Sequence, residues 1–492
     1  EVEVTDLEIL NTSELTPIYI TDELDALEET RLKYRYLDLR RPVMQNNFIV
    51  RHKAAQAVRT FLNNEGFLEF ETPILTKSTP EGARDYLVPS RISGGEFYAL
   101  PQSPQIFKQL LMISGFEKYY QLAKCFRDED LRSDRQPEFT QIDIETSFMD
   151  QDEILEVSER MIKFVMKEVK GIDLPEKFPR ITFEYAMDKY GVDKPDTRFD
   201  MLLNDVTKLA NETTFGVFTS NIENGGIVKA INVKNAASEY SRKKIDKLTD
   251  HVKKYKARGL AFLKFVNGEF SGSITKFFTP EQFTTLKEQL DVEENDLLLF
   301  VSDSKDVTNA SLGALRNLVA KQLNLYSDED YDFVWVIDWP MFEFREEQQR
   351  YYSLHHPFTR VQDEHLPLLD SDPSKALAYC YDLCVQGQEL GGGSVRIHKT
   401  DLQNKVFDIL GISKEEQQAK FGFLLDALKY GTPPHAGIAF GFDRLIMLLV
   451  HTENIRDVVA FPKTNSAQCI LTEAPSKVAE DQLAELSIKT LK

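Results

Sequence analysis

The sequence predicts an α+β fold, in which a mainly antiparallel sheet is flanked by helices and carries an inserted α+β domain. Residues 119–126 and 139–148 have the composition of strands and enclose a charged loop, which indicates a long antiparallel hairpin. Before the hairpin, apolar residues recur at helical spacing over 46–66, and a short strand at 67–70 ends at Pro73.

The pattern changes between residues 198 and 327, where a separate mixture of helix and strand signals predicts the inserted domain. Beyond it, 333–337 reads as a buried strand, and a helix with an N-terminal capping box at Ser413 and Glu416 leads to a strand and an apolar helix over 437–450. These shifts separate three zones, from about 46 to 197, from about 198 to 327, and beyond. The division into five segments, 1–30, 31–197, 198–327, 328–462 and 463–492, is what the resemblance given below implies.

The composition is that of a soluble globular chain, with 492 residues, 42% hydrophobic and 28% charged. The spacing of its four cysteines, Cys125, Cys380, Cys384 and Cys469, suits neither a disulfide framework nor a C-x-x-C zinc site, so we expect a reducing cytoplasm. No apolar run reaches the ~18 residues of a membrane span, and we expect no membrane partner.

The net charge of −20 argues, at face value, against a nucleic-acid partner. Two local basic runs, 31–41 and 242–258, weaken that argument, although such runs are more often solvated helical faces. Residues 1–10 alternate like a strand that starts in mid-pattern, so we expect an N-terminal piece to be missing.

The second strand of the hairpin carries a polar face formed by Gln141, Asp143 and Glu145, because side chains alternate along a strand. Arg127 and Glu129 likewise point together at the end of the first strand. A ligand site and an ordinary sheet facing water both fit this pattern.

Two further motifs contain glycine. Glu389 precedes the glycines at 391–393 and Arg396, a pattern in which the backbone can approach a ligand and the carboxylate can hold a divalent cation against phosphate. A tight turn is the simpler alternative, and no P-loop or dinucleotide fingerprint is present. Arg444 follows Gly441 at a helix start, where a guanidinium can meet phosphate or an aromatic base, or simply cap the helix.

In this order, the segments resemble class II aminoacyl-tRNA synthetases, and among them the bacterial aspartyl-tRNA synthetases. The resemblance rests on the helix and strand ending at Pro73, on YYQLAKCFRDEDLRSDRQPEFTQIDIE from Tyr119, and on GIAFGFDRL from Gly437. It implies a homodimer formed through the first of these, a catalytic domain in two parts, a bacterial-type insert, and a C-terminal extension. Residues 1–30 are then the remnant of an anticodon-binding barrel and its hinge.

The resemblance implies ATP-dependent activation of L-aspartate to aspartyl-adenylate, followed by transfer to the 3′-hydroxyl of the terminal adenosine of tRNA(Asp), with tRNA(Asn) as a further candidate. Arg127 and Arg444 are the implied catalytic residues, Arg127 bridging the α-phosphate and the aspartate carboxylate. Asp382 and Glu389 are the implied Mg²⁺ ligands. The implied ATP-binding residues are Arg127, Asp128, Glu129, Gln136, Phe139, Glu389, Gly441, Phe442, Asp443 and Arg444.

For the amino acid, the resemblance implies that Arg396 and Lys108 bind the side-chain carboxylate, and that Asp143 and Glu81, from a mobile loop at 78–85, bind the ammonium group. The implied aspartate site comprises Glu81, Ser103, Gln105, Lys108, Arg127, Asp143, His355 and Arg396, with His356 beside them. Two cations favour aspartate over asparagine, because a neutral amide leaves buried charge uncompensated.

Two other functions remain open from sequence. A catalytically silent paralogue would keep the fold to bind tRNA or amino acid, and an asparagine-forming amidoligase would make the same adenylate. Silent paralogues usually lose a phosphate-binding arginine or a metal carboxylate, whereas Arg127, Arg444, Asp382 and Glu389 are all present here.

Overall fold

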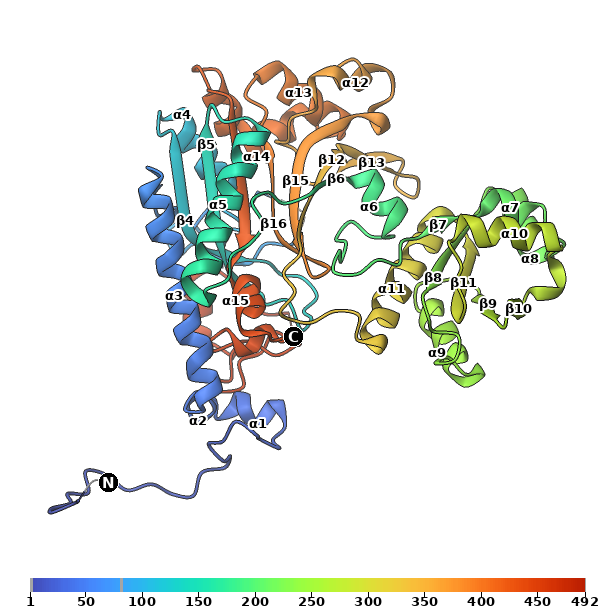
Figure 1. Cartoon of the computed structure of the whole chain (residues 1–492). Helices are drawn as coiled ribbons and strands as arrows, with labels where there is room; N and C mark the ends of the chain where they lie inside the picture. The colour runs from blue at the N-terminus through green and yellow to red at the C-terminus, as the bar shows by residue number, and fades with distance from the viewer. Residues whose placement is uncertain (1–2, 80–82, 492) are drawn as a thin grey trace. The chain divides into compact units, whose positions relative to one another are not determined.

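A computed structural model describes residues 3–79 and 83–491 (Figure 1). The chain forms two compact units, one made of Glu1–Leu174 with Arg396–Lys492 and the other of Pro175–Val395. Over the described residues, every helix is too short or too polar to cross a lipid bilayer.

The sheet of the first unit is built around the predicted hairpin. Strand β4 (Lys118–Phe126) pairs antiparallel with β5 (Glu138–Ser147), with Phe126 opposite Glu138, so the hairpin prediction is confirmed. On one side β1 (Leu68–Glu69) runs parallel to β4, and on the other β17 (His435–Gly441) runs antiparallel to β5.

Helices surround these strands, and the longest two, α3 (Pro42–Asn64) and α5 (Gln151–Lys170), pack against each other (Figure 1). Helix α5 begins with a capping box between Asp150 and Glu153, and it ends at Gly171, whose φ of 71° suits the left-handed cap. The unit also contains a short hairpin and further helices: β2 (Leu87–Pro89), β3 (Phe97–Ala99), α1 (Glu28–Lys33), α2 (Arg35–Asp38), α4 (Gln105–Ile113), α13 (Thr400–Ile409), α14 (Lys414–Leu428), α15 (Phe442–Val450) and α16 (Glu480–Glu485).

The second unit contains four strands of mainly antiparallel sheet and a separate five-stranded sheet. In the first group β6 (Arg180–Thr182) runs parallel to β12 (Phe333–Pro340), which pairs antiparallel with β15 (Leu377–Val385), and β15 with β16 (Gln388–Val395). The five-stranded sheet lies wholly within the predicted insert, in the order β10 (Glu269–Gly272), β9 (Ala261–Val266), β11 (Asp296–Asp303), β8 (Ile227–Val233), β7 (Asn204–Asp205).

Both faces of the five-stranded sheet are covered. Leu297 and Leu299 of β11 belong to one apolar cluster, while Leu298 and Phe300, pointing the other way, belong to a second. The helices of this unit are α6 (Phe183–Lys189), α7 (Thr207–Asn211), α8 (Gly216–Glu223), α9 (Arg242–Lys253), α10 (Pro280–Gln289), α11 (Lys305–Leu323) and α12 (Leu368–Ser371), with a small hairpin of β13 (Phe342–Arg345) and β14 (Arg350–Ser353). The α+β fold with mainly antiparallel sheets flanked by helices is thus confirmed.

One sequence expectation is wrong and another is confirmed. Residues 3–27 form neither helix nor strand, so the strand predicted at 1–10 is wrong over its described part. Residues 242–253 of the basic run form α9, which buries Ile245, Leu248 and Val252 on one face, so this part of the run is the helical face that was expected. Both predicted insert boundaries, 197 and 327, lie inside the second compact unit, and the division into five segments stays a prediction.

A buried carboxylate fixes the start of the first unit. Asp38 is fully buried and accepts hydrogen bonds from Arg31 (3.0 Å), Arg35 (2.6 Å) and Arg41 (2.8 Å). Arg35 also donates to the backbone carbonyls of Val459 and Ala460, so the group ties α1 and α2 to the C-terminal part of the chain. Burial alone would raise the pKa of Asp38, but the arginines hold that pKa below its ordinary value.

We expect Asp38→Ala to lower the free energy of unfolding by about 3 to 5 kcal/mol, because it leaves buried guanidinium groups uncompensated. Urea denaturation at neutral pH measures this. The control is Asp173→Ala, whose partner Lys167 and own side chain are exposed, and it should cost about 0 to 1 kcal/mol.

The same prediction has a pH signature. The pKa of Asp38 is lower in the folded chain than the roughly 3.9 of an unfolded aspartate. The contribution of Asp38 to the free energy of unfolding is therefore complete above the unfolded pKa, and it is lost as pH falls through the folded pKa. The stability gap between wild type and Asp38→Ala should therefore narrow in acid. A gap that widened in acid would contradict this assignment.

Candidate active site

A cluster of four buried charges lies on the polar face of β5. Lys108, from α4, donates to Asp143 at 2.7 Å and lies 3.2 Å from Glu145. Arg396 forks onto Glu145 through Nε (3.0 Å) and Nη2 (3.1 Å). Each of the four side chains is at most 2% exposed. Two cations and two carboxylates thus compensate each other out of water.

The local sequence explains this geometry. Asp143 and Glu145 are two residues apart on a strand, so both point to the same face. The neighbouring strand β17 places Gly437 opposite Glu145, and a Cβ there would overlap the Glu145 carboxylate. The backbone N–H of Arg396 donates to His435 at 2.9 Å, which fixes where its side chain begins. A glycine at position 437 therefore leaves the space that the Glu145 carboxylate occupies.

The two carboxylates have different protonation behaviour. Burial raises the pKa of Asp143 despite Lys108. Burial also acts on Glu145, but Arg396 and Lys108 together hold its pKa below the ordinary value. Among the described residues, Asp143 Oδ2 is buried without a hydrogen bond within 3.5 Å. The neighbouring Tyr119 hydroxyl donates to Gln121 at 3.0 Å, and burial together with Asp143 raises the pKa of that hydroxyl. Asp143 therefore keeps acceptor capacity that a ligand can use.

This arrangement changes the picture predicted from sequence. Lys108, Asp143 and Arg396 are brought together, as expected of a single site. However, both cations are already paired with carboxylates of the protein. Arg396 donates two hydrogen bonds to Glu145, which was not among the predicted site residues. Its position two residues after Asp143 on the same strand face was the signal that would have identified it.

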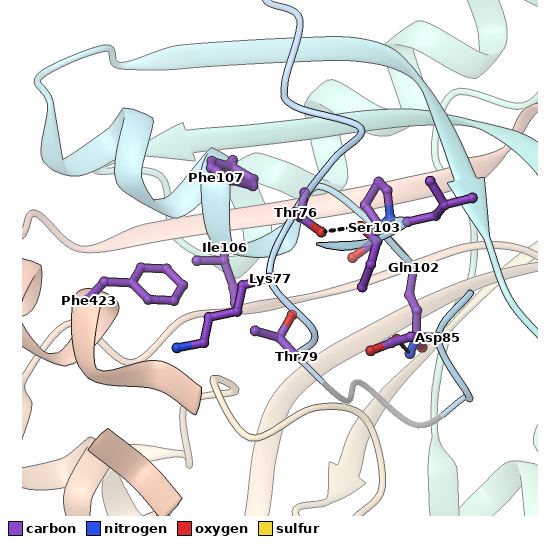
Figure 2. Close-up of a pocket in the computed structure, with 12 residues that line it drawn as sticks. Thr76, Lys77, Thr79, Asp85, Gln102, Ser103, Ile106, Phe107 and Phe423 are labelled. Carbon is purple, nitrogen blue, oxygen red and sulfur yellow. Dashed lines mark hydrogen bonds between the residues drawn. The ribbon is translucent and has the colours of Figure 1, made fainter. Parts of the chain in front are cut away.

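The start of α4 and the loop before it border this cluster. Gln105 is 6% exposed and donates to Gln109, which in turn contacts His435 at 3.1 Å. Ser103 accepts from the backbone N–H of Gln105 at 3.3 Å. Ser103 and Ile106 also line a small cavity of about 50 Å³ together with Thr76, as Figure 2 shows.

Gln102 anchors the loop that the sequence analysis expected to be mobile. Its Nε2 donates to Ala83 O (2.8 Å) and to Asp85 (2.5 Å), and its Oε1 accepts from Ala83 N. The predicted ligand residue Glu81 lies outside the described residues. Gln102 was not predicted, and it fixes the point at which this loop rejoins the described chain.

Arg127 and Phe139 meet at the open end of the hairpin. The Arg127 guanidinium lies 5.1 Å from the centroid of the Phe139 ring, and its backbone N–H donates to Pro137. Glu129 pairs with Arg135 at 3.3 Å, with both side chains partly exposed. Asp128 lies 3.5 Å from Arg84 and is largely exposed. These groups can reach a ligand, because none of them is fully buried.

The side chain of Gln136 is used within the protein. It is 2% exposed, donates to Lys463 O at 3.0 Å and accepts from Lys463 N at 2.7 Å. Both ends of its amide are thus committed to one backbone segment. The amide thus anchors Lys463 to the hairpin, and the ATP-binding role of Gln136 stays a prediction.

Asp443 is also committed internally. It pairs with Arg51 of α3 at 2.6 Å, and its other oxygen accepts from the backbone N–H of Thr140 at 2.8 Å. The Arg51 guanidinium lies 4.7 Å from the ring of Phe442, which is 3% exposed. These contacts hold the start of α15 in place, and the ATP-binding roles of Phe442 and Asp443 stay predictions.

The clamp formed by Arg51, Asp443 and Thr140 holds two neighbouring residues. Thr140 follows Phe139, and Asp443 precedes Arg444, so one ion pair fixes the backbone beside both. Arg444 is 28% exposed and lies 3.6 Å from Asp134. Gly441 ends β17 and is the N-cap of α15, as the sequence predicted for a strand that passes into a helix.

The second unit carries an acidic pair on adjacent strands. Asp382 of β15 lies opposite Gly392 of β16, and a Cβ on Gly392 would overlap Asp382 Oδ1 and approach Glu389 Oε1 to 3.4 Å. The glycine run is thus part of a strand, which rules out the tight turn. Asp382 is 4% exposed, and over the described chain its Oδ1 has no hydrogen-bond partner. Burial and Glu389 raise the pKa of Asp382 well above its ordinary value.

The two predicted histidines also lie in the second unit. His355 packs edge-on against Trp339 with ring centroids 4.8 Å apart. His356 Nδ1 accepts from the backbone N–H of Phe358 at 3.2 Å, and its Nε2 lies 3.4 Å from Ser394 Oγ. His356 therefore helps to hold the loop before β15, next to the end of β16.

Comparisons with known proteins agree with this geometry. The family described as tRNA synthetases class II (D, K and N) matches residues 27–465. Proteins named aspartate–tRNA(Asp/Asn) ligase from Bacillus anthracis (strain CDC 684 / NRRL 3495) and Bacillus cereus (strain ATCC 10987 / NRS 248) are each 59% identical over 489 residues, covering 99% of this chain and 83% of theirs.

A solved structure has a similar fold. It is an asparaginyl-tRNA synthetase from Pyrococcus horikoshii complexed with asparaginyl-adenylate, and it matches with a TM-score of 0.54 at 19% identity. The match covers 94% of this chain and 78% of that one. At this identity the likeness concerns the fold alone.

We expect Glu145→Gln to lower the free energy of unfolding by about 3 to 5 kcal/mol, because Arg396 then carries an uncompensated buried charge. Combining Glu145→Gln with Arg396→Met removes both charges and should recover most of the loss. Urea denaturation of the three proteins measures this. Glu69→Gln, an exposed partner of Arg59, is the control. Equal losses in the single and double variants would contradict the coupling.

Proposed function

The chain belongs to the class II tRNA synthetases of the D, K and N group, and we propose that it uses ATP to activate L-aspartate and esterifies the aspartyl group to tRNA. In the first step a carboxylate oxygen of aspartate attacks the α-phosphorus of ATP, and pyrophosphate leaves. In the second, the 3′-hydroxyl of the terminal adenosine attacks the acyl carbon, and AMP leaves. Neither step needs a covalent enzyme intermediate.

The observation that carries this proposal is the buried cluster on β5 with its unused acceptor. Asp143 Oδ2 is a buried oxygen that needs a donor, and an amino-acid ammonium group supplies one. Lys108 and Arg396 lie in the same cluster and are the groups proposed to receive the aspartate side chain. Gln105, one turn before Lys108 on α4, and Ser103, which accepts from the Gln105 backbone N–H, are proposed to complete the aspartate site.

Charge balance favours aspartate over asparagine. Lys108, Arg396 and Arg127 carry three positive charges against two negative charges on Asp143 and Glu145. Zwitterionic aspartate carries one net negative charge and balances the site, whereas asparagine carries none. Asparagine would leave the excess positive charge of these three cations unbalanced, which favours aspartate.

The nucleotide is proposed to bind between Phe139 and Arg444. An aromatic ring and a guanidinium on opposite faces of adenine both gain from stacking. Arg127, which lies over Phe139, is proposed to bridge the α-phosphate and the aspartate carboxylate, where its fixed charge stabilises the negative charge of the transition state. Catalysis then consists of positioning and charge stabilisation.

Asp382 and Glu389 fit a divalent cation, because Asp382 has an unpartnered buried oxygen and Gly392 leaves the space beside both carboxylates. Mg²⁺ is usually held by one or two carboxylates together with substrate phosphates, whose charge it neutralises. The two residues are proposed to hold that ion with its ATP. His355 and His356 are proposed to contribute to the aspartate site.

The acceptor is proposed to be tRNA(Asp), with tRNA(Asn) as a second acceptor, since the Bacillus relatives are named for both. Those names favour tRNA over ammonia as the acceptor of the aspartyl group. A homodimer in the cytoplasm is proposed as well. The apolar residues exposed along α3 and the segment after it support the dimer: Val43, Ile49, Leu68, Ile74 and Leu75.

Arg127→Ala should lower aspartate-dependent pyrophosphate exchange into ATP by about 10²- to 10³-fold, because it removes a transition-state charge stabiliser. The urea midpoint should stay close to that of wild type. Arg160→Ala, which removes an ion-paired arginine on α5, is the control and should keep its exchange rate. Exchange that survived in Arg127→Ala, or that responded strongly to another standard amino acid, would overturn the assignment.

Charging assays with labelled aspartate test the acceptor. We expect label to enter tRNA(Asp) and tRNA(Asn) transcripts when ATP and Mg²⁺ are present, and no labelled free asparagine to form when ammonia replaces tRNA. Transfer to tRNA(Asp) alone would restrict the proposal to one acceptor. Labelled asparagine would instead establish an amidoligase.

A further inference from the structure

Lys194 lies against the acidic pair of the second unit. Its Nζ is 3.1 Å from Glu389 Oε2 and 3.9 Å from Asp193. The Lys194 side chain is 39% exposed and that of Glu389 is 34% exposed, whereas Asp382 is nearly fully buried. The ammonium group therefore occupies the open side of the carboxylate pair.

The charges facing Lys194 explain why it stays there. Burial alone would lower its pKa, but Glu389, Asp193 and Asp382 raise that pKa above the ordinary value of a lysine. Cys384 also borders the pair, and burial and the same carboxylates raise the pKa of its thiol, so the thiol adds no charge. Lys194 is thus the cation that compensates the pair in the absence of a ligand.

The Lys194 backbone is anchored while its ammonium end can leave. Asp193 O accepts a weak hydrogen bond from Cys384 Sγ (3.9 Å), and Asp196 is held by Arg198 at 2.7 Å. Asp196 also packs beside Gly387, in the turn between β15 and β16. A lysine on this fixed segment can withdraw by rotating its four-carbon side chain, since more than a third of that side chain is exposed.

From the contact of Lys194 Nζ with Glu389 at 3.1 Å, we propose that Lys194 is a resident counter-cation of the Asp382–Glu389 pair, and that a divalent cation must displace its ammonium group from Glu389 in order to bind. The proposal rests on the metal site of the proposed function. Two cations a few ångströms apart repel each other, so Lys194 lowers the affinity of the nucleotide-free site for a divalent metal. It thereby makes tight metal binding depend on the phosphates that arrive with ATP, while it keeps Asp382 compensated until then.

Mn²⁺ titration of the nucleotide-free protein tests this directly, with free Mn²⁺ measured by electron paramagnetic resonance. We expect Lys194→Met to bind Mn²⁺ about tenfold more tightly than wild type, and Lys194→Arg to stay close to wild type because it keeps the charge. Lys189→Met is the matched control. It removes a lysine paired with a partly exposed aspartate at 3.1 Å and should leave the affinity unchanged. Asp382→Asn should abolish the binding.

The outcomes distinguish a failure of the role proposed for Lys194 from a failure of the proposed metal site. Equal affinities for wild type and Lys194→Met, with binding that still depends on Asp382, would overturn the role of Lys194 and leave the metal site standing. Weaker Mn²⁺ binding in Lys194→Met would also overturn the role of Lys194, because it would mean that Lys194 helps the site to bind metal. If no variant, Lys194→Met included, bound Mn²⁺ through Asp382, both the metal site and the role of Lys194 would fail. Circular dichroism of each variant checks folding.

Discussion

The burial of Glu145 and Asp143 on one face of β5 is the constraint on which the first unit depends. A carboxylate without a partner in such a position is expensive, so the chain must bring cations to it. Lys108 arrives from α4, and Arg396 from a segment more than 200 residues further along the chain. The ion pairs thus fix the position of α4 and of Arg396 relative to β5.

Other buried carboxylates also need partners, and the partners that they find differ. Asp38 accepts hydrogen bonds from three arginines, and Asp443 accepts from Arg51 and a backbone N–H, so both oxygens of each carboxylate have a partner within the protein. Asp143 and Asp382 each keep one buried oxygen without a partner in the described chain. Incomplete satisfaction distinguishes the groups proposed to meet a ligand from the groups that support them.

The sequence predicted the parts of the site that depend on local pattern. The hairpin, the shared face of Asp143 and Glu145, and the helix start at Arg444 follow from alternation and from a glycine at a strand end, and the structure has them. Arg51 and Lys194 could not be predicted this way, because each acts through a contact with a residue nearly 200 or more positions away. Asp443 and Gln136 were predicted to bind ATP from their places in a motif. Their contacts with Arg51 and Lys463 could not be predicted, because these partners lie more than 300 positions away in the sequence.

The Arg51 clamp adds a physical link between assembly and chemistry. Arg51 lies on α3, the helix whose exposed apolar residues support the proposed dimer, and its guanidinium holds the backbone beside Phe139 and Arg444. A shift of α3 at a subunit interface would reach both residues through one ion pair at 2.6 Å and one hydrogen bond at 2.8 Å. An adenine held between an aromatic ring and a guanidinium tolerates little change in their spacing. In the proposed dimer, a partner subunit that fixes α3 would therefore also fix the proposed nucleotide site.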